Sequence, residues 1–165
     1  MRKTALVTGM HTRLAYLVAE KLIKDGNMRV IAPVRVRESD RVDALIRNYG
    51  ENVIVSDFSP LDFQEAKELV AAADYILNLD FVGMPESEHF PDFAEKVNYF
   101  YTKNLVDAVI ETGSDAKIIE LSTTGIYGGR TLKRTRRSDT PQCRRITTLR
   151  ACRNFAAKDT LSKAG

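Results

Sequence analysis

Short apolar runs alternate along the chain with stretches in which apolar residues recur every three or four positions. The runs predict five buried strands, at 5–7, 30–34, 53–55, 75–79 and 117–121. The three- to four-residue spacing predicts helices at 14–22, 43–49, 61–73 and 93–112. Strands that are apolar along their whole length are typical of a parallel sheet covered on both faces. The alternating order therefore predicts an α/β fold with a doubly wound parallel sheet.

The pattern is lost after Gly129, and no sixth strand follows, so we expect the sheet to be incomplete at its C-terminal side. The sequence therefore predicts that the chain divides into a domain at 1–129 and a divergent basic tail at 130–165. The tail holds eleven of the 25 Lys and Arg residues but two of the 22 Asp and Glu residues. Its formal charge is therefore +9, whereas the domain carries −6.

Composition narrows the class of protein. A hydrophobic fraction of 44% and a charged fraction of 28% are ordinary for a globular domain. No apolar run approaches the ~20 residues that a membrane helix needs, and the run at 4–8 is too short for an export signal. We expect a cytoplasmic protein without membrane contact. Cys143 and Cys152 lack metal-ligand spacing, so no metal site is expected.

A candidate phosphate-binding turn lies between the first predicted strand and the first helix. The segment reads Thr-Gly-Met-His-Thr-Arg-Leu-Ala from Thr8 to Ala15. Glycine suits such a turn because the backbone turns sharply and approaches a pyrophosphate, whose charge meets the free N–H groups of the helix. Thr12 and Ala15 stand where a glycine-rich pattern has further glycines. An ordinary tight turn between strand and helix is the alternative.

Three ordered segments resemble the extended and atypical short-chain dehydrogenase/reductases, the NAD(P)-dependent epimerase/dehydratase group. Residues 6–9 (LVTG) resemble the family's opening motif. Residues 97–108 (VNYFYTKNLVDA) are similar to its helix motif "VNxxGTxNLLEAA", and residues 118–128 (IIELSTTGIYG) to "xxVxxSSxxVYG". The resemblance covers about the first 129 residues and implies a Rossmann-like, NAD(P)-binding domain.

The resemblance implies roles for the cofactor-binding residues. Gly9, Thr12, Arg13 and Leu14 would flank the pyrophosphate, with the Thr12 side chain in the cofactor's space. Arg35 follows the second strand, where an acidic residue would favour NAD; an arginine favours the 2′-phosphate of NADP. We therefore expect NADP rather than NAD as the cofactor. The alternative, of equal weight, is that Arg35 is a solvated loop cation that does not contact the cofactor.

The resemblance assigns further cofactor-site residues to positions after the third and fourth predicted strands and on the predicted helix at 93–112. Asp57 and Phe58 would line the adenine; the alternative for Asp57 is a helix or turn cap before Ser59. Leu79 would lie against the cofactor, and Asn98 matches the asparagine that supports the active site.

The catalytic set of the family is incomplete in this chain. The resemblance assigns the catalytic hydroxyl to Thr123, although hydroxyls at the end of a strand commonly just satisfy backbone groups. The family's Tyr-xxx-Lys pair should follow about twenty residues later, yet all six tyrosines occur by Tyr127. One explanation is a frameshift near Gly129, because codons for residues 145–149 can spell Asp-Asn-Tyr-Ala when read two bases along.

Two functions follow as expectations. The first is an NAD(P)-dependent epimerase/dehydratase or reductase that transfers hydride at an oxygen-bearing carbon of a small molecule such as a nucleotide sugar. The second is a catalytically inactive, truncated nucleotide-binding fragment. The tail is expected to be a disordered basic extension and not a nucleic-acid site, because Phe155 is its one aromatic residue. A homodimer through the helix at 93–112 is a further expectation.

Overall fold

The computed structural model describes residues 2–34 and 40–122 of the 165-residue chain. The chain divides into two compact units. The first comprises residues up to Phe81 together with Phe100–Leu121, and the described part of the second is Val82–Tyr99 and Ser122. The predicted boundary at 129 lies outside the described residues and stays a prediction.

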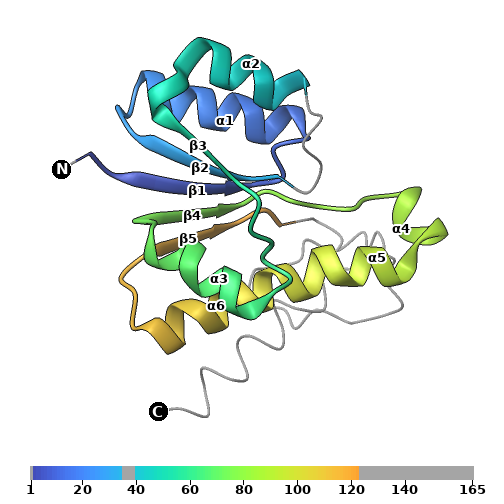
Figure 1. Ribbon diagram of the computed structural model, residues 1–165. Coiled ribbons are helices and arrows are strands. Elements are labelled where there is room, and N and C mark those ends of the chain that lie inside the picture. Colours follow the sequence, from blue (N-terminus) through green and yellow to red (C-terminus); the bar gives the residue numbers. More distant parts are fainter. Residues whose placement is uncertain (1, 35–39, 123–165) are drawn as a thin grey trace, which may run out of the picture. The chain divides into compact units, whose positions relative to one another are not determined.

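Five parallel strands form the sheet of the first unit (Figure 1). They are β1 (Thr4–Thr8), β2 (Arg29–Pro33), β3 (Val53–Ser56), β4 (Tyr75–Asn78) and β5 (Lys117–Glu120). Their order is β3-β2-β1-β4-β5, so the direction of winding reverses between β1 and β4. The predicted α/β fold with a doubly wound parallel sheet is confirmed.

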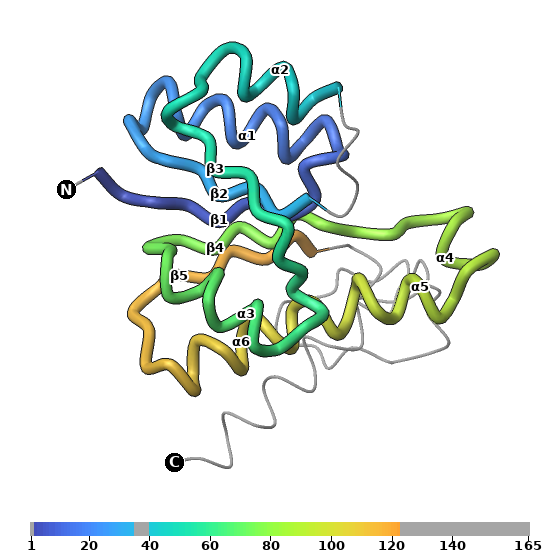
Figure 2. The backbone as a smooth tube through the Cα atoms, viewed as in Figure 1, coloured from blue at the N-terminus to red at the C-terminus, as the bar shows by residue number. Residues whose placement is uncertain are grey.

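Helices cover both faces of this sheet (Figures 1 and 2). One face carries α1 (Arg13–Lys24) and α2 (Asp40–Tyr49), and the opposite face carries α3 (Phe63–Ala71) and α6 (Tyr101–Thr112). The tube in Figure 2 shows how α3 carries the chain from β3, at one edge, across to β4 on the far side of β1. A short 3₁₀ turn (Gly50–Asn52) links α2 to β3.

The two faces of the sheet build separate cores because successive strand residues point to opposite sides. Ala5 and Val7 of β1 pack with Ala15, Ala19 and other apolar residues below α1 and α2. Leu6, between them in sequence, packs instead with Leu69 of α3 and Leu105 of α6. The apolar runs of the central strands are therefore explained by cover on both sides.

Cover is thinner on the two strands that have one neighbour each among the described residues. Ile54 and Val55 of β3 are 42% and 40% exposed, and Ile119 of β5 is 51% exposed. The prediction that every strand is covered on both faces thus holds for β1, β2 and β4. The apolar pattern alone did not separate central strands from outer ones.

The helix predicted over 93–112 is divided into three consecutive segments. These are α5 (Pro91–Glu95), one π-helical turn (Lys96–Phe100) and α6. The short helix α4 (Glu86–His89) precedes them and was not predicted. The remaining predicted elements agree with the structure to within a few residues at their ends.

Candidate functional site

The turn after β1 needs glycine because of the backbone of Leu79 and Asp80, which directly follow β4. Gly9 has φ of +76°, in the left-handed region that L side chains rarely adopt. A Cβ there would lie 2.8 Å from the Asp80 Cα atom and 2.9 Å from the Leu79 carbonyl carbon. The Thr12 amide then donates to the Gly9 carbonyl over 2.8 Å and closes the turn. The glycine is thus explained by close packing at the point where the strand order reverses.

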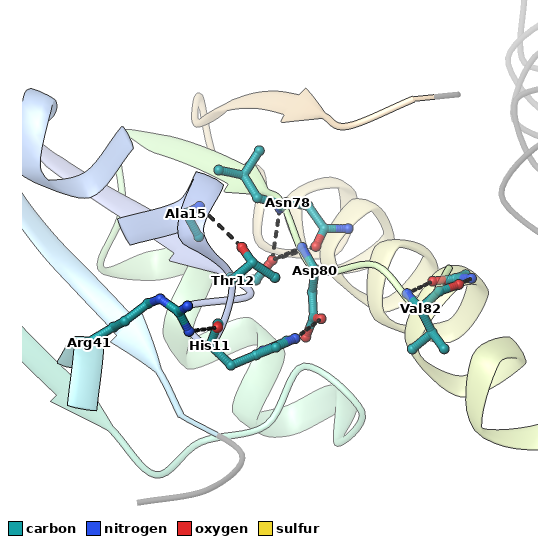
Figure 3. A network of polar contacts seen from close by, with 10 residues as sticks. His11, Thr12, Ala15, Arg41, Asn78, Asp80 and Val82 are labelled. Carbon is teal, nitrogen blue, oxygen red and sulfur yellow. Dashed lines mark hydrogen bonds and ion pairs between the residues drawn. The ribbon is translucent and has the colours of Figure 1, made fainter. Parts of the chain in front are cut away.

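Thr12 caps α1 with its side chain. Its φ of −88° and ψ of 150° are extended, and its Oγ1 accepts from the Ala15 amide over 3.2 Å (Figure 3). The Arg13 and Leu14 amides are the first two N–H groups of the helix, and they have no acceptor within the described part of the chain. Two amides at a helix N-terminus are a ready site for an anion such as a phosphate.

Charged side chains surround this turn (Figure 3). The exposed guanidinium of Arg41, at the start of α2, donates to the His11 carbonyl over 2.7 Å. The His11 Nε2 atom lies 3.8 Å from an Asp80 carboxylate oxygen. The Asp80 side chain is 3% exposed, whereas that of His11 is 52% exposed. A buried carboxylate therefore lies beside the turn, with an imidazole that can pair with it when protonated.

A row of polar side chains crosses the sheet where the central strands end. Thr8 of β1 is in register with Asn78 of β4, which is in register with Glu120 of β5. The Thr8 hydroxyl donates to Asn78 Oδ1 over 2.5 Å, and Asn78 Nδ2 donates to Glu120 Oε2 over 2.9 Å. Thr102 of α6 joins the row, since its Oγ1 accepts from Asn78 Nδ2 over 2.6 Å and donates to Glu120 Oε1 over 3.3 Å.

The hydrogen bonds of this row are consistent with one another. Thr8 Oγ1 accepts from the Leu79 and Asp80 amides, so its own hydrogen goes to Asn78 Oδ1. Both Asn78 Nδ2 hydrogens are then used, and the Thr102 hydrogen goes to the carboxylate. Glu120 accepts on both oxygens, from Asn78 and from Thr102. We call Thr8, Asn78, Thr102 and Glu120 the polar row.

The predicted adenine-lining residues follow β3. Asp57 is exposed and Phe58 is 39% exposed. The cap of α3 is Asp62, whose Oδ1 accepts from the Gln64 amide over 2.8 Å and from the Glu65 amide over 3.1 Å, so Asp57 does not cap this helix. Leu79, predicted to lie against the cofactor, is buried beside the Gly9 turn.

Asn98 lies in the second unit, where it joins two segments of chain. Its Oδ1 accepts from the Val82 amide over 2.8 Å, and its Nδ2 donates to the Val82 carbonyl over 2.9 Å. The side chain is completely buried and lies in the π-helical turn. Both ends of the amide are therefore engaged in holding the segment that follows β4 against the helix.

The two remaining predicted site residues, Arg35 and Thr123, lie outside the described residues, so their roles stay predictions. Within 2–34 and 40–122, no group of three or more His, Cys, Asp or Glu side chains could hold a metal ion. No helix of these ranges has both the length and the apolar character to cross a membrane.

Sequence reasoning did not assign a function to Arg41, His11, Asn78, Thr102 or Glu120. Asn78 and Glu120 carried a usable signal, because each is a polar residue that directly follows apolar residues in a predicted strand. Arg41 gave no such signal, since its approach to His11 depends on how α2 packs beside α1.

Comparison with solved structures finds the same fold in several enzymes. UDP-glucose 4-epimerase from Bifidobacterium longum, solved with NAD⁺ and UDP, is 20% identical, with a TM-score of 0.74 over 98% of this chain and 49% of that one. The enzyme WbmH from Bordetella bronchiseptica, solved with NAD⁺, is 16% identical, with a TM-score of 0.75 over 100% and 54%. A short-chain dehydrogenase from Streptomyces avermitilis is 20% identical, with a TM-score of 0.59 over 78% and 51%.

At these identities the likeness shows the fold alone, a Rossmann-like α/β fold. The chain spans about half the length of these structures. No protein-family model and no curated protein sequence matches it.

Proposed function

We propose that this chain binds a nicotinamide dinucleotide across the carboxyl ends of β1 and β4, with the pyrophosphate at the N-terminus of α1. The observation that carries this proposal is the pair of α1 amides, of Arg13 and Leu14, beside the Gly9 turn. In open α/β sheets, ligands bind where the strand order reverses, and here the reversal lies between β1 and β4.

The charges around the turn support a phosphate ligand in part. Arg41 places a guanidinium beside the His11 carbonyl, and a protonated His11 would add a second cation. The Asp80 carboxylate opposes an anion, and a protonated His11 imidazole, 3.8 Å away, would offset it. The residues present therefore fit a pyrophosphate at the two α1 amides when a protonated His11 offsets the charge of Asp80.

The likeness in fold supports a role in NAD(P)-dependent epimerase, dehydratase or reductase chemistry. A bound nicotinamide would supply the hydride acceptor or donor for an oxygen-bearing carbon of a small molecule. Thr123, which follows β5 in sequence, would position the substrate oxygen. Two structural neighbours support a nucleotide sugar as the substrate class. The UDP-glucose 4-epimerase from Bifidobacterium longum was solved with NAD⁺ and UDP, and the one from Stenotrophomonas maltophila with NAD and formylated UDP-arabinopyranose.

A second candidate is a dinucleotide-binding protein without turnover, and the sequence favours it. None of the six tyrosines lies beyond Tyr127, so residues 128–165 supply no tyrosine to exchange a proton with the substrate. Calorimetric binding together with an assay of hydride transfer distinguishes the two candidates. Binding without turnover supports the second, and turnover supports the first.

For the cofactor itself we propose NADP rather than NAD. Arg35 is one cation for the 2′-phosphate, and Arg41, at the start of α2, is another that lies near the turn. Substituting both by Ala should weaken NADP⁺ binding by about ten-fold and leave NAD⁺ unchanged. Equal losses for the two dinucleotides would contradict the preference.

The proposed phosphate site can be tested one amide at a time. Arg13→Pro deletes the first free N–H, and proline is favoured at the first position of a helix. The extended backbone of Thr12 suits a residue that precedes proline. Arg13→Ala is the matched control, because it removes the same cation and keeps the amide. We expect Arg13→Pro to bind NADP⁺ about ten-fold more weakly than Arg13→Ala in calorimetric titration.

Equal affinities in these two variants, with both folded, would overturn the phosphate site. Failure of the wild-type chain to bind NAD⁺, NADP⁺ and ADP-ribose would overturn the proposed function as a whole.

Self-association through residues 93–112 is a separate proposal. Ile110 of α6 is 70% exposed, which supports an apolar contact on this helix. Ile110→Glu should convert a dimer into a monomer in sedimentation analysis. A wild-type chain that is monomeric at high concentration would overturn the proposal.

A further inference from the structure

An open depression at the amino ends of the strands has no part in the proposed function. Its volume is about 680 Å³, which suits a small molecule. Two cations, one aromatic ring, one thioether and the turn between α1 and β2 line it: Arg2, Lys3, Tyr75, Met28, Gly26 and Asn27. We call it the amino-end depression. Both charged residues of its lining are positive, whereas residues 1–129 together carry −6.

Neutral partners hold the two cations in place. Arg2 Nη1 donates to Asn52 Oδ1 over 2.6 Å, which leaves the other guanidinium N–H groups for a ligand. Lys3 Nζ donates to the Tyr75 hydroxyl over 3.2 Å and lies 5.1 Å from the centre of the Tyr75 ring. An amide oxygen, a phenol and a ring orient a cation but carry no charge that cancels it. Both positive charges therefore remain available to an anion.

The carboxylates that directly precede lining residues in the chain have other partners. Asp25 pairs with Lys21 Nζ at 2.5 Å. Asp74 Oδ2 accepts from the Thr4 amide over 2.7 Å. Within the described ranges, neither carboxylate forms an ion pair with a cation of the depression, so the lining keeps its positive charge.

The turn that ends α1 supplies a further part of the wall. Asn27 has φ of +45°, a left-handed backbone that asparagine adopts more readily than most residues. The amides of Gly26 and Met28, on either side, both donate to the Leu22 carbonyl, over 3.1 and 3.2 Å. This carbonyl at the end of the helix is therefore already bonded, and it opposes an anion less than an unpaired one would.

We propose that the amino-end depression binds a small-molecule phosphomonoester that carries an apolar group. Such a phosphate has a charge of about −2 at pH 7, which matches the two cations of the lining. The Arg2 guanidinium can donate to two phosphate oxygens in parallel, and the Tyr75 ring and the Met28 thioether offer apolar contacts. This site and the proposed dinucleotide site lie at opposite ends of the strands, so the inference does not rest on the proposed function.

Phenyl phosphate is the first probe, titrated into the ¹⁵N-labelled wild-type chain and followed by NMR. We expect the amide resonances of Asn27 and Met28 to shift with a dissociation constant of about 1 mM at low salt, since both cations are exposed. The constant should rise at least about three-fold at about 500 mM NaCl. Benzoate has the same ring and a single negative charge, and it should bind at least about five-fold more weakly. Equal binding of the two ligands, or shifts at Arg13 and Leu14 alone, overturns the inference.

Arg2→Gln and Lys3→Gln give the second test, since each removes one charge from the lining. We expect each to weaken the binding of phenyl phosphate at least about five-fold. Arg47→Gln is the matched control: it removes an exposed cation in the last turn of α2, outside the lining, and should change the constant less than about two-fold. All three residues are exposed, so the variants should fold, which circular dichroism checks.

The remaining outcomes either support or overturn this site. If Arg2→Gln and Lys3→Gln bind phenyl phosphate like the wild type, or Arg47→Gln weakens it equally, the inference is overturned. A phosphoserine peptide that binds more tightly than phenyl phosphate would assign the depression to a protein partner and overturn the small-molecule ligand. Failure to bind NAD⁺, NADP⁺ and ADP-ribose overturns the proposed function and has no bearing on this site.

Discussion

The two ends of the parallel sheet differ in how they treat polar groups. At the amino ends, the charged side chains Arg2, Lys3, Arg29 and Lys117 are exposed, and Lys3 Nζ donates to the Tyr75 hydroxyl over 3.2 Å. The same end has an open depression of about 680 Å³ lined by Arg2, Lys3, Gly26, Asn27, Met28 and Tyr75. At the carboxyl ends, polar side chains are buried instead: Thr8, Asn78, Asp80 and Thr102 are 1%, 0%, 2% and 3% exposed.

This difference shows where the chain accepts an energetic cost. Burying a polar group without its hydrogen bonds costs about 1–3 kcal/mol, so each buried group at the carboxyl ends requires partners that only the folded chain supplies. The amino ends could be closed with apolar residues or solvated charges at no such cost. Selection for stability alone would not favour buried polar side chains at the carboxyl ends of the strands. The carboxyl ends are therefore the better candidate for a functional site.

The largest expected effect comes from breaking the polar row at its centre. Asn78→Leu removes three hydrogen bonds and leaves Thr8, Thr102 and Glu120 without their shared partner. We expect the free energy of unfolding to fall by about 3–4 kcal/mol in urea titrations. At the amino ends, Tyr75→Phe removes the bond from Lys3 and should cost less than about 0.5 kcal/mol. Similar losses at the two ends would remove the contrast between them.

The next effect concerns the turn after β1. Gly9→Ala places a Cβ 2.8 Å from the Asp80 backbone at φ +76°, and we expect it to destabilise the fold by about 2–3 kcal/mol. Gly113→Ala is the matched control, because Gly113 has φ +62° and an added Cβ there would meet nothing within 4 Å among the described residues. It should lose about 1 kcal/mol, from backbone strain alone. Equal thermal-melt shifts for the two variants would show that packing against β4 does not explain Gly9.

A smaller effect is expected at the cap of α1. Thr12→Ala removes the acceptor of the Ala15 amide and should lower stability by about 1 kcal/mol in urea titrations. Thr12→Ser keeps the hydroxyl and should restore most of this loss. If Ser is as destabilising as Ala, the methyl group rather than the cap is responsible.

The smallest effect belongs to a half-buried pair that links α1 to α2. The Tyr49 hydroxyl donates to Glu20 over 2.9 Å, and this bond, with Lys24 nearby, lowers the pKa of Glu20 below its ordinary 4.5. Because the pKa is lower in the folded chain, the stabilisation is present above pH 4.5 and is lost as the pH falls through the folded value. The urea midpoint of Glu20→Gln should therefore lie slightly below that of the wild type at pH 7 and converge with it in acid. A constant gap across this range would contradict the assignment.

Most of the fold could be predicted from periodicity. The runs at 5–7 and 30–34 became β1 and β2 because central strands of a parallel sheet are apolar on both faces. The division of the helix predicted over 93–112 could not be seen, since Val97, Tyr101 and Leu105 recur every four residues across it, as they would in one α-helix. The short α4 also lacked a periodic signal, because four residues make one turn.

The candidate site was predicted only in outline. Sequence placed Gly9 and Thr12 in the turn between β1 and α1, but it did not predict that the Thr12 side chain accepts from the Ala15 amide. The polar row depends on the register of three strands that are distant in sequence, and this register becomes visible only when they pair. Arg41 likewise reaches the turn through the packing of one helix beside another.

The packing of Gly9 has a consequence for how glycine signatures are interpreted. Its small size is required by the neighbouring strand, whether or not any coenzyme is present. A descendant that had abandoned nucleotide binding would still be selected to retain this glycine in order to fold. A glycine at the position of Gly9 is therefore evidence of a shared fold. Evidence of nucleotide binding must come from other positions.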